Sequence, residues 1–182
     1  MAPPPLRPDR SIVLVGLMGA GKSTVGQRLA KRLGISFIDS DEEVERAARR
    51  SIPEIFDRFG EADFRDGERR VIRRLVDGEP KVIATGGGAF VDEETRALIL
   101  QRCIAVWLRA DVETLAERVS RRDHRPLLKD RDAAEVLSRL SETRSPHYAA
   151  AHLHVQTGDG PHERTVDAII QALSHWKQVP LA

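Results

Sequence analysis

The sequence predicts a doubly wound α/β domain in which helices flank a five-stranded parallel sheet. Two observations support this prediction. Five short apolar runs alternate with segments of helical periodicity along the 182 residues, a length that suits one domain. A glycine-rich loop joins the first apolar run to the first helical segment, an arrangement typical of such sheets.

The first two predicted strands are each followed by a helix. Residues 11–15 form a β-branched apolar run, and residues 25–33 have helical spacing. Residues 35–38 form the second run, and Ser40 or Asp41 can cap the helix that follows.

A longer helical stretch comes next. It begins at Ser51, has Pro53 near its first turn and continues to residue 77. Its expected buried stripe contains Phe64, Val71, Ile72 and Leu75.

The third and fourth strands surround another capped helix. Residues 81–85 form the third strand, and Asp92 caps a helix to residue 102. Residues 103–108 are almost continuously apolar, which predicts a strand buried on both faces.

The last third of the chain contains the segment that is hardest to assign. Asp111 caps a helix to residue 120, and the charged, aperiodic residues 121–132 are expected to form a mobile loop. A helix over 133–144, a strand over 153–156 and a helix over 163–174 follow.

The composition excludes several classes of protein. A hydrophobic share of 41% and a charged share of 31% are those of a globular domain. The net charge of +1 indicates no general attraction to nucleic acid or membrane, and no apolar stretch approaches a membrane span. The single Cys103 suits a reducing cytosol, and residues 1–10 read as a disordered tail without a signal peptide.

Residues 16–24 carry the most specific motif of the chain. They fit G-x-x-x-x-G-K-[ST], with Gly16, Gly21, Lys22 and Ser23 at the fixed positions. Such a loop turns its backbone N–H groups toward phosphates, while the lysine reaches the β- and γ-phosphates and the hydroxyl ligates Mg²⁺. The motif therefore predicts a nucleoside triphosphate site, the alternative being a plain glycine turn.

Two carboxylates follow the second strand. Asp39 and Asp41 would point to the same side of an extended segment, toward the γ-phosphate. One of them can help to hold Mg²⁺, and the other can accept a proton from an attacking hydroxyl. Either could also be a helix cap.

Three further features are ambiguous when each is considered alone. Gly86-Gly87-Gly88 suits a ligand lying against the backbone, or a flexible turn. Arg65 and Glu68 share a helical face, which fits a positioned guanidinium or a surface ion pair. Arg125, within 121–132, fits a closing lid or a solvated loop, and Arg144 is equally undecided.

Taken together, the motifs resemble those of the shikimate kinase family. Between about Ser11 and Leu173 they run G-x-x-G-A-G-K-S-T, D-S-D, F-R-x-x-E, G-G-G, R-P-L-L and R-x-P-x-Y. The resemblance implies a single P-loop kinase domain over residues 11–182, similar to nucleoside monophosphate kinases, with a mobile lid at about 121–132. It implies transfer of the ATP γ-phosphate to the 3-hydroxyl of shikimate by a cytoplasmic monomer, in the pathway to aromatic amino acids.

The resemblance also assigns residues to the two substrates. ATP is expected at Gly19, Ala20, Gly21, Lys22, Ser23, Thr24, Arg118 and Arg125, with Arg118 beside the adenine, near the turn at Gly158 to Pro161. Mg²⁺ is expected at Ser23 and Asp39. Shikimate is expected at Asp41, Arg65, Gly86, Gly87, Gly88 and Arg144, with both arginines on its carboxylate. The implied catalytic residues are Asp41 as candidate base, Lys22 and Arg125.

Three other functions fit the sequence less well. A kinase of gluconate or of a nucleoside monophosphate would share the P-loop scaffold without the whole motif set. A GTP-binding switch is excluded because the sequence contains no asparagine for an N-K-x-D motif. A non-catalytic nucleotide-binding module is disfavoured by the intact Lys22, Ser23 and Asp41.

Overall fold

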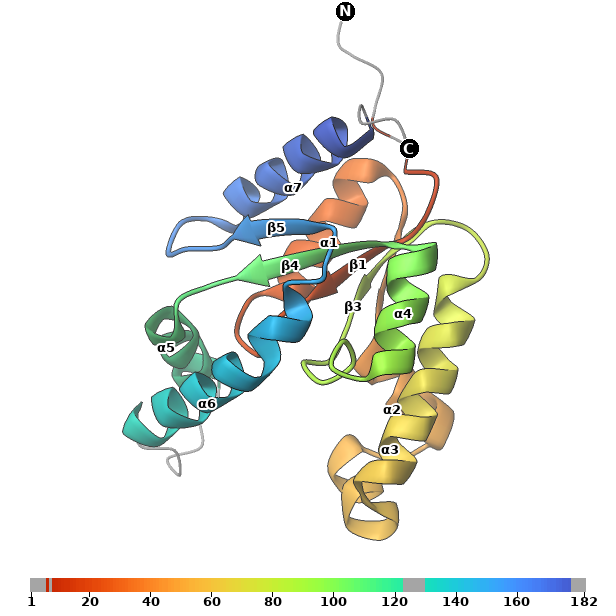
Figure 1. The fold of residues 1–182 in the computed structure, drawn as a ribbon, viewed down its shortest axis with the longest axis vertical. Helices are drawn as coiled ribbons and strands as arrows, with labels where there is room; N and C mark the ends of the chain where they lie inside the picture. Colours follow the sequence, from red (N-terminus) through yellow and green to blue (C-terminus); the bar gives the residue numbers. More distant parts are fainter. Residues whose placement is uncertain (1–5, 7, 123–129, 178–182) are drawn as a thin grey trace, which may run out of the picture.

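Five parallel strands form the centre of the structure, in the order β2-β3-β1-β4-β5 (Figure 1). The structure is a computed structural model that describes residues 6, 8–122 and 130–177. The strands are β1 Ile12–Val15, β2 Ser36–Asp39, β3 Lys81–Ala84, β4 Ile104–Arg109 and β5 Leu153–Gln156. The predicted five-stranded parallel sheet is thus confirmed.

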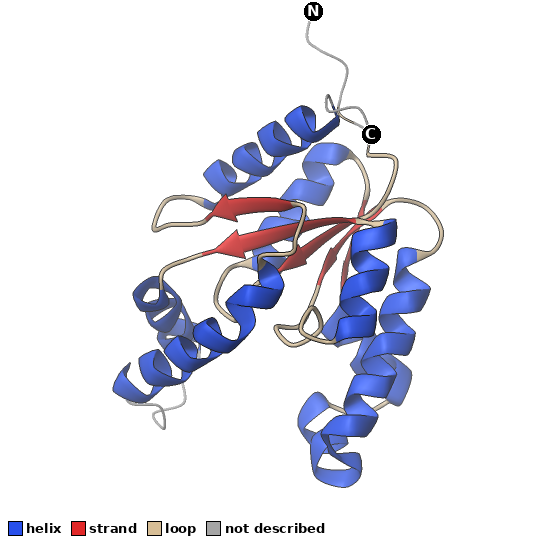
Figure 2. Ribbon diagram, viewed as in Figure 1, coloured by secondary structure: helices blue, strands red, loops and turns tan. Residues whose placement is uncertain are grey.

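Seven helices connect and cover these strands within the described residues (Figure 2). They are α1 Lys22–Leu33, α2 Ser40–Ala48, α3 Ile52–Val76, α4 Glu93–Arg102, α5 Val112–Arg122, α6 Asp130–Tyr148 and α7 His162–Lys177. Gly60, at φ 82°, interrupts the helical backbone inside α3. No helix in the described part of the chain is long and apolar enough to cross a membrane.

The direction of the crossovers explains where the helices lie. The chain moves from β1 to β2 in one direction and from β3 to β4 in the other, so right-handed crossovers place α1 and α4 on opposite faces. α1 packs against α7, and α3 packs against α4 (Figure 1). This reversal creates a crevice at the carboxyl ends of the central strands, where ligands of such sheets bind.

The central strand is fully buried. All four residues of β1 have no exposed surface, because β3 and β4 pair with it on either edge and helices cover both faces. The stripe predicted for α3 is also buried, with Phe64, Val71, Ile72 and Leu75 all at most 6% exposed. The core therefore fixes the ends of the strands that carry the polar motifs.

The start of α2 differs from the prediction. Neither Ser40 nor Asp41 is the cap, because both lie inside the helix. The cap is Asp39, whose Oδ1 accepts hydrogen bonds from the backbone N–H groups of Asp41 (2.9 Å) and Glu42 (3.4 Å). Asp39 and Asp41 consequently do not share an extended segment, and the prediction that they do is wrong.

The predicted loop over residues 121–132 is too long at both ends. α5 continues to Arg122 and α6 begins at Asp130, while residues 123–129 lie outside the described part of the chain. Charged residues without apolar periodicity can still form the end of a helix, so such a sequence resembles a loop.

α6 also extends past the predicted end at Arg144. It continues through Pro146 to Tyr148, which is completely buried. A proline removes one helical hydrogen bond, and burial of a large aromatic ring offsets that loss.

Candidate active site

The glycine-rich loop connects β1 to the amino end of α1. Gly19 (φ 83°) and Gly21 (φ 89°) adopt left-handed conformations that side chains disfavour, and Gly21 is the N-cap of α1. The loop and the first turn of the helix, from Gly19 to Thr24, therefore form a concentrated set of N–H donors at a helix amino terminus, which favours anions.

Lys22 lies folded back over this loop. Its ammonium donates hydrogen bonds to the carbonyl oxygens of Gly16 (2.7 Å) and Leu17 (3.0 Å). Burial lowers the pKa of Lys22 from 10.5 to about 8, although the nearby carboxylates of Asp41 and Asp39 act in the opposite direction. An anion bound in this loop would therefore stabilise the charged form of Lys22.

Ser23 and Asp39 meet beside Lys22. The Ser23 hydroxyl donates a hydrogen bond of 2.8 Å to Oδ2 of Asp39, while Oδ1 of the same carboxylate caps α2. Two hard oxygen atoms at this separation fit Mg²⁺, which takes few protein ligands and keeps several waters. The geometry therefore brings together both residues predicted for the metal.

The triple glycine after β3 forms a surface on which three charged side chains lie. A Cβ added to Gly86 would meet Oδ1 of Asp41 at 2.6 Å, and one added to Gly87 would meet Nη1 of Arg144 at 2.6 Å. A Cβ on Gly88 would lie 2.3 Å from Nη2 of Arg65. None of these glycines has a positive φ, so they are needed here for space and not for backbone conformation.

Asp41 and Arg65 are held in contrasting ways. Burial, and then the charge of Asp39, raise the pKa of Asp41 above its ordinary value, although Lys22 lowers it. Arg65 donates a 2.7 Å hydrogen bond to Glu68, which is only 1% exposed. Burial raises the pKa of Glu68, and the bond to Arg65 opposes this shift. The pair is therefore no ordinary surface ion pair.

Arg118 links the glycine-rich loop to the turn after β5. Its guanidinium donates hydrogen bonds to the carbonyls of Gly19 (3.2 Å) and Gly158. A cleft beside it is lined by Gly19, Gly21, Glu117, Arg118, Arg121, Asp159, Gly160 and His162. The cleft opens directly next to the phosphate-binding loop, in the region predicted for adenine. Arg125, the remaining predicted residue, lies outside the described part of the chain.

Three residues hold the backbone around Gly86-Gly87-Gly88, the glycine run, and had no role in the sequence prediction. Both the backbone N–H and the hydroxyl of Thr85 donate to the Leu14 carbonyl, which ties the start of the run to β1. Arg96 donates to the carbonyls of Phe90 and Val91 at its other end. The Tyr148 hydroxyl donates to the Gly87 carbonyl. Only Tyr148 carried a sequence signal, as the last residue of R-x-P-x-Y.

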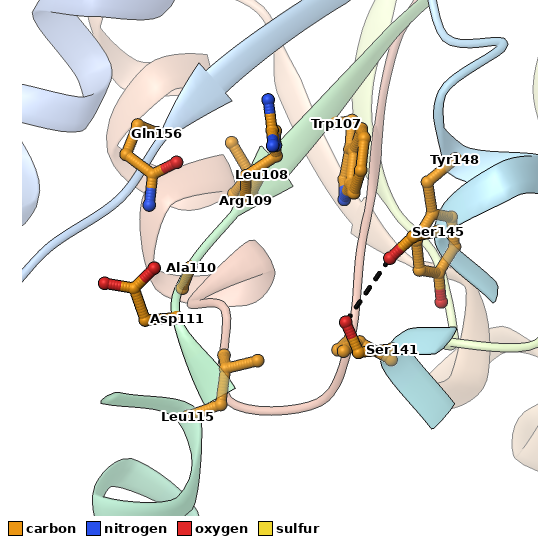
Figure 3. A pocket seen from close by; sticks show the side chains of 11 residues that line it. Trp107, Leu108, Arg109, Ala110, Asp111, Leu115, Ser141, Ser145, Tyr148 and Gln156 are labelled. Carbon is orange, nitrogen blue, oxygen red and sulfur yellow. Dashed lines mark hydrogen bonds between the residues drawn. The ribbon is translucent and has the colours of Figure 1, made fainter. Parts of the chain in front are cut away.

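A second cavity lies beside this site, between β4, α5 and α6 (Figure 3). It shares Leu17 and Tyr148 with the site, and Figure 3 shows Trp107, Ser141 and Ser145 around it. The hydroxyls of Ser141 and Ser145 lie 3.4 Å apart, within hydrogen-bond distance.

Comparison with known proteins agrees on one family. The family model described as shikimate kinase matches residues 18–174. A shikimate kinase from Caulobacter vibrioides is 62% identical over 169 residues, covering 93% of this chain and 84% of the relative. One from Zymomonas mobilis is 58% identical over 164 residues, covering 90% and 93%. The structure of a shikimate kinase from Acinetobacter baumannii in complex with shikimate has a TM-score of 0.85 at 39% identity, covering 93% of this chain and 96% of that one.

Proposed function

The chain belongs to the shikimate kinase family, and we propose from this premise how its residues share the ATP-dependent phosphorylation of shikimate. The observation that carries the proposal is the glycine run: Asp41, Arg144 and Arg65 each lie against one of its three successive glycines. These side chains come from three separate helices and meet at the carboxyl edge of the sheet, next to the phosphate-binding loop. The reaction places the γ-phosphoryl group of ATP on the 3-hydroxyl of shikimate.

The donor half of the site is proposed to extend from Gly19 to Thr24. The N–H groups of the loop and Lys22 would bind the phosphates, with Lys22 exchanging its present carbonyl partners for phosphate oxygens. Ser23 and Asp39 would hold Mg²⁺, which neutralises phosphate charge when bound. Arg118 would lie beside the adenine in its cleft, and Arg125 would reach the phosphates from the lid.

The acceptor half is proposed to lie on the glycine run. Arg65 and Arg144 would bind the shikimate carboxylate, for which a guanidinium fork is the matching group. Asp41 would accept a hydrogen bond from the reacting hydroxyl and orient it in line with the γ-phosphate. The raised pKa of Asp41 makes it a better proton acceptor than an ordinary aspartate, although phosphoryl transfer needs positioning more than a strong base.

We further propose that the chain acts in the cytoplasm as a monomer on small molecules, without binding nucleic acid or membrane. The near-neutral net charge supports the absence of nucleic-acid and membrane binding, whereas the location and the monomeric state rest on the resemblance to the family. The proposed domain extends over residues 11–182, with residues 1–10 as a tail and the lid at about 121–132.

A coupled ADP-release assay tests the proposed function. Shikimate, gluconate and AMP are offered separately as acceptors to the full chain with Mg·ATP. We expect turnover with shikimate and none with gluconate or AMP. Lys22→Ala should abolish the turnover with shikimate. Turnover with gluconate or AMP but not with shikimate would refute the proposal.

A further inference from the structure

Tyr148 occupies an unusual position for the only tyrosine of the chain. It is the last residue of α6, has no exposed surface, and its hydroxyl donates a hydrogen bond to the carbonyl of Gly87. Its ring lies 5.8 Å from the ring of Trp107 on β4, and both side chains face the cavity in Figure 3. The phenol therefore connects α6, the sheet and the middle of the glycine run.

Arg144 approaches the same glycine from one turn earlier in α6. Residues four apart share a helical face, so Arg144 and Tyr148 reach Gly87 together. A Cβ on Gly87 would lie 2.6 Å from Nη1 of Arg144 and 3.7 Å from the Tyr148 hydroxyl. The guanidinium and the phenol consequently meet over one glycine.

A long arginine side chain has many rotamers, and a binding site needs one of them. Burial raises the pKa of Tyr148, and the neighbouring Arg144 acts against this rise. The neutral phenol has one proton, which it donates to the Gly87 carbonyl, so its oxygen is left able to accept a hydrogen bond from the neighbouring Arg144. The ring has no exposed surface and packs with Trp107, which restricts its movement.

We propose that Tyr148 is a positioning residue for the acceptor: anchored by its hydrogen bond to the Gly87 carbonyl, it holds the Arg144 guanidinium in place for the shikimate carboxylate. The inference rests on the proposed function, since it assumes that Arg144 binds that carboxylate. A tyrosine that only filled the core would need no hydroxyl, and phenylalanine would serve equally well.

Tyr148→Phe is the informative variant, because it keeps the ring and removes the hydroxyl. The KM for shikimate should rise by about tenfold, the effect of one lost hydrogen bond in a site. The kcat at saturating shikimate and the KM for ATP should change by less than about twofold, since neither depends on the carboxylate grip.

Ser11→Ala is the matched control. Its hydroxyl is buried (Ser11 is 4% exposed) and accepts one hydrogen bond from the Lys81 backbone, as the Tyr148 hydroxyl makes one to a backbone group. Ser11 lies at the amino end of β1, away from the site. Thermal melting of both variants should show similar small losses of stability, and the KM for shikimate should be unchanged in Ser11→Ala.

A double-mutant cycle separates positioning from general loosening. In an Arg144→Ala background, Tyr148→Phe should change the KM for shikimate by less than about twofold, because the group it positions is gone. An unchanged KM in the single variant, a tenfold effect that persists without Arg144, or an equal effect of Ser11→Ala would each overturn the inference. Absence of shikimate turnover in the unmodified chain would instead refute the proposed function.

Discussion

Gly88 is the position at which one added carbon atom should disturb the acceptor site most. In Gly88→Ala the new Cβ would lie 2.3 Å from Nη2, 2.7 Å from Nη1 and 2.8 Å from Cζ of Arg65. Non-bonded heavy atoms separate to roughly 3.5 Å, so Nη2 must retreat by about 1.2 Å. The whole guanidinium moves, because all three of these atoms are too close.

The displacement should weaken substrate binding and leave folding nearly intact. The displaced group is the end of a flexible side chain, and Gly88 has no positive φ, so the free energy of unfolding should change by less than about 1 kcal/mol. Loss of a hydrogen bond to a charged group costs about 1.5–3 kcal/mol, which corresponds to a rise in the KM for shikimate of roughly 10- to 150-fold.

Initial-rate kinetics with varied shikimate at saturating ATP, together with thermal melting, measure both quantities. Gly67→Ala is the matched control, since a Cβ there meets nothing within 4 Å inside the helix α3. That variant should gain about 0.5–1 kcal/mol of stability and keep its KM. An unchanged KM for shikimate in Gly88→Ala would refute the placement of the carboxylate at Arg65.

Four further predictions concern the donor side and the base. Asp41→Asn should lower kcat at least about 100-fold with nearly unchanged ATP binding, and a normal kcat would contradict the role of Asp41. The variant should also melt at a higher temperature, because burial and the charge of Asp39 make a charged carboxylate unfavourable at this position. ATP affinity should fall as the pH rises through about 8, where buried Lys22 loses its charge, and a constant affinity from pH 7 to 9 would be inconsistent with this. The lowered pKa of Lys22 should also make the free energy of unfolding increase between about pH 8 and 10.5, because in this range Lys22 holds its proton in the unfolded chain and has released it in the folded one. Denaturant titrations should show that Lys22→Met removes this increase. Arg118→Ala should raise the KM for ATP and leave that for shikimate unchanged, and equal effects on the two would argue against a role at the adenine.

The strands were predicted well because each is a short apolar run with a clear polar boundary. The fifth strand has the predicted bounds of 153–156. The first and third strands differ from the prediction by one residue at one end, and the second and fourth are each shifted by one residue. The errors lie where tertiary packing outweighs a local signal. Pro146 ordinarily ends a helix, but the burial of Tyr148 extends α6 past it.

The two aspartates illustrate the same limit within the site. By residue type they are equivalent, and residue chemistry left open which would hold the metal. In the structure Asp39 ends β2, contacts Ser23 and caps α2, whereas Asp41 lies in the first turn of the helix against Gly86. Because Asp39 caps the helix and Asp41 lies inside it, the two carboxylates have different surroundings. The spacing of the two residues in the sequence does not predict this difference.

The sequence by itself determined the nucleotide-binding loop, the parallel sheet and the family, because these depend on contiguous residues and on the order of motifs. Only the tertiary structure decided which side chain lies on which glycine. The order β2-β3-β1 places the carboxyl ends of the three strands side by side, and α3 and α6 then bring Arg65 and Arg144 to the same surface from distant positions in the chain. Contacts of that kind depend on the packing of whole elements, whereas local patterns reach only across one turn of helix or two residues of strand.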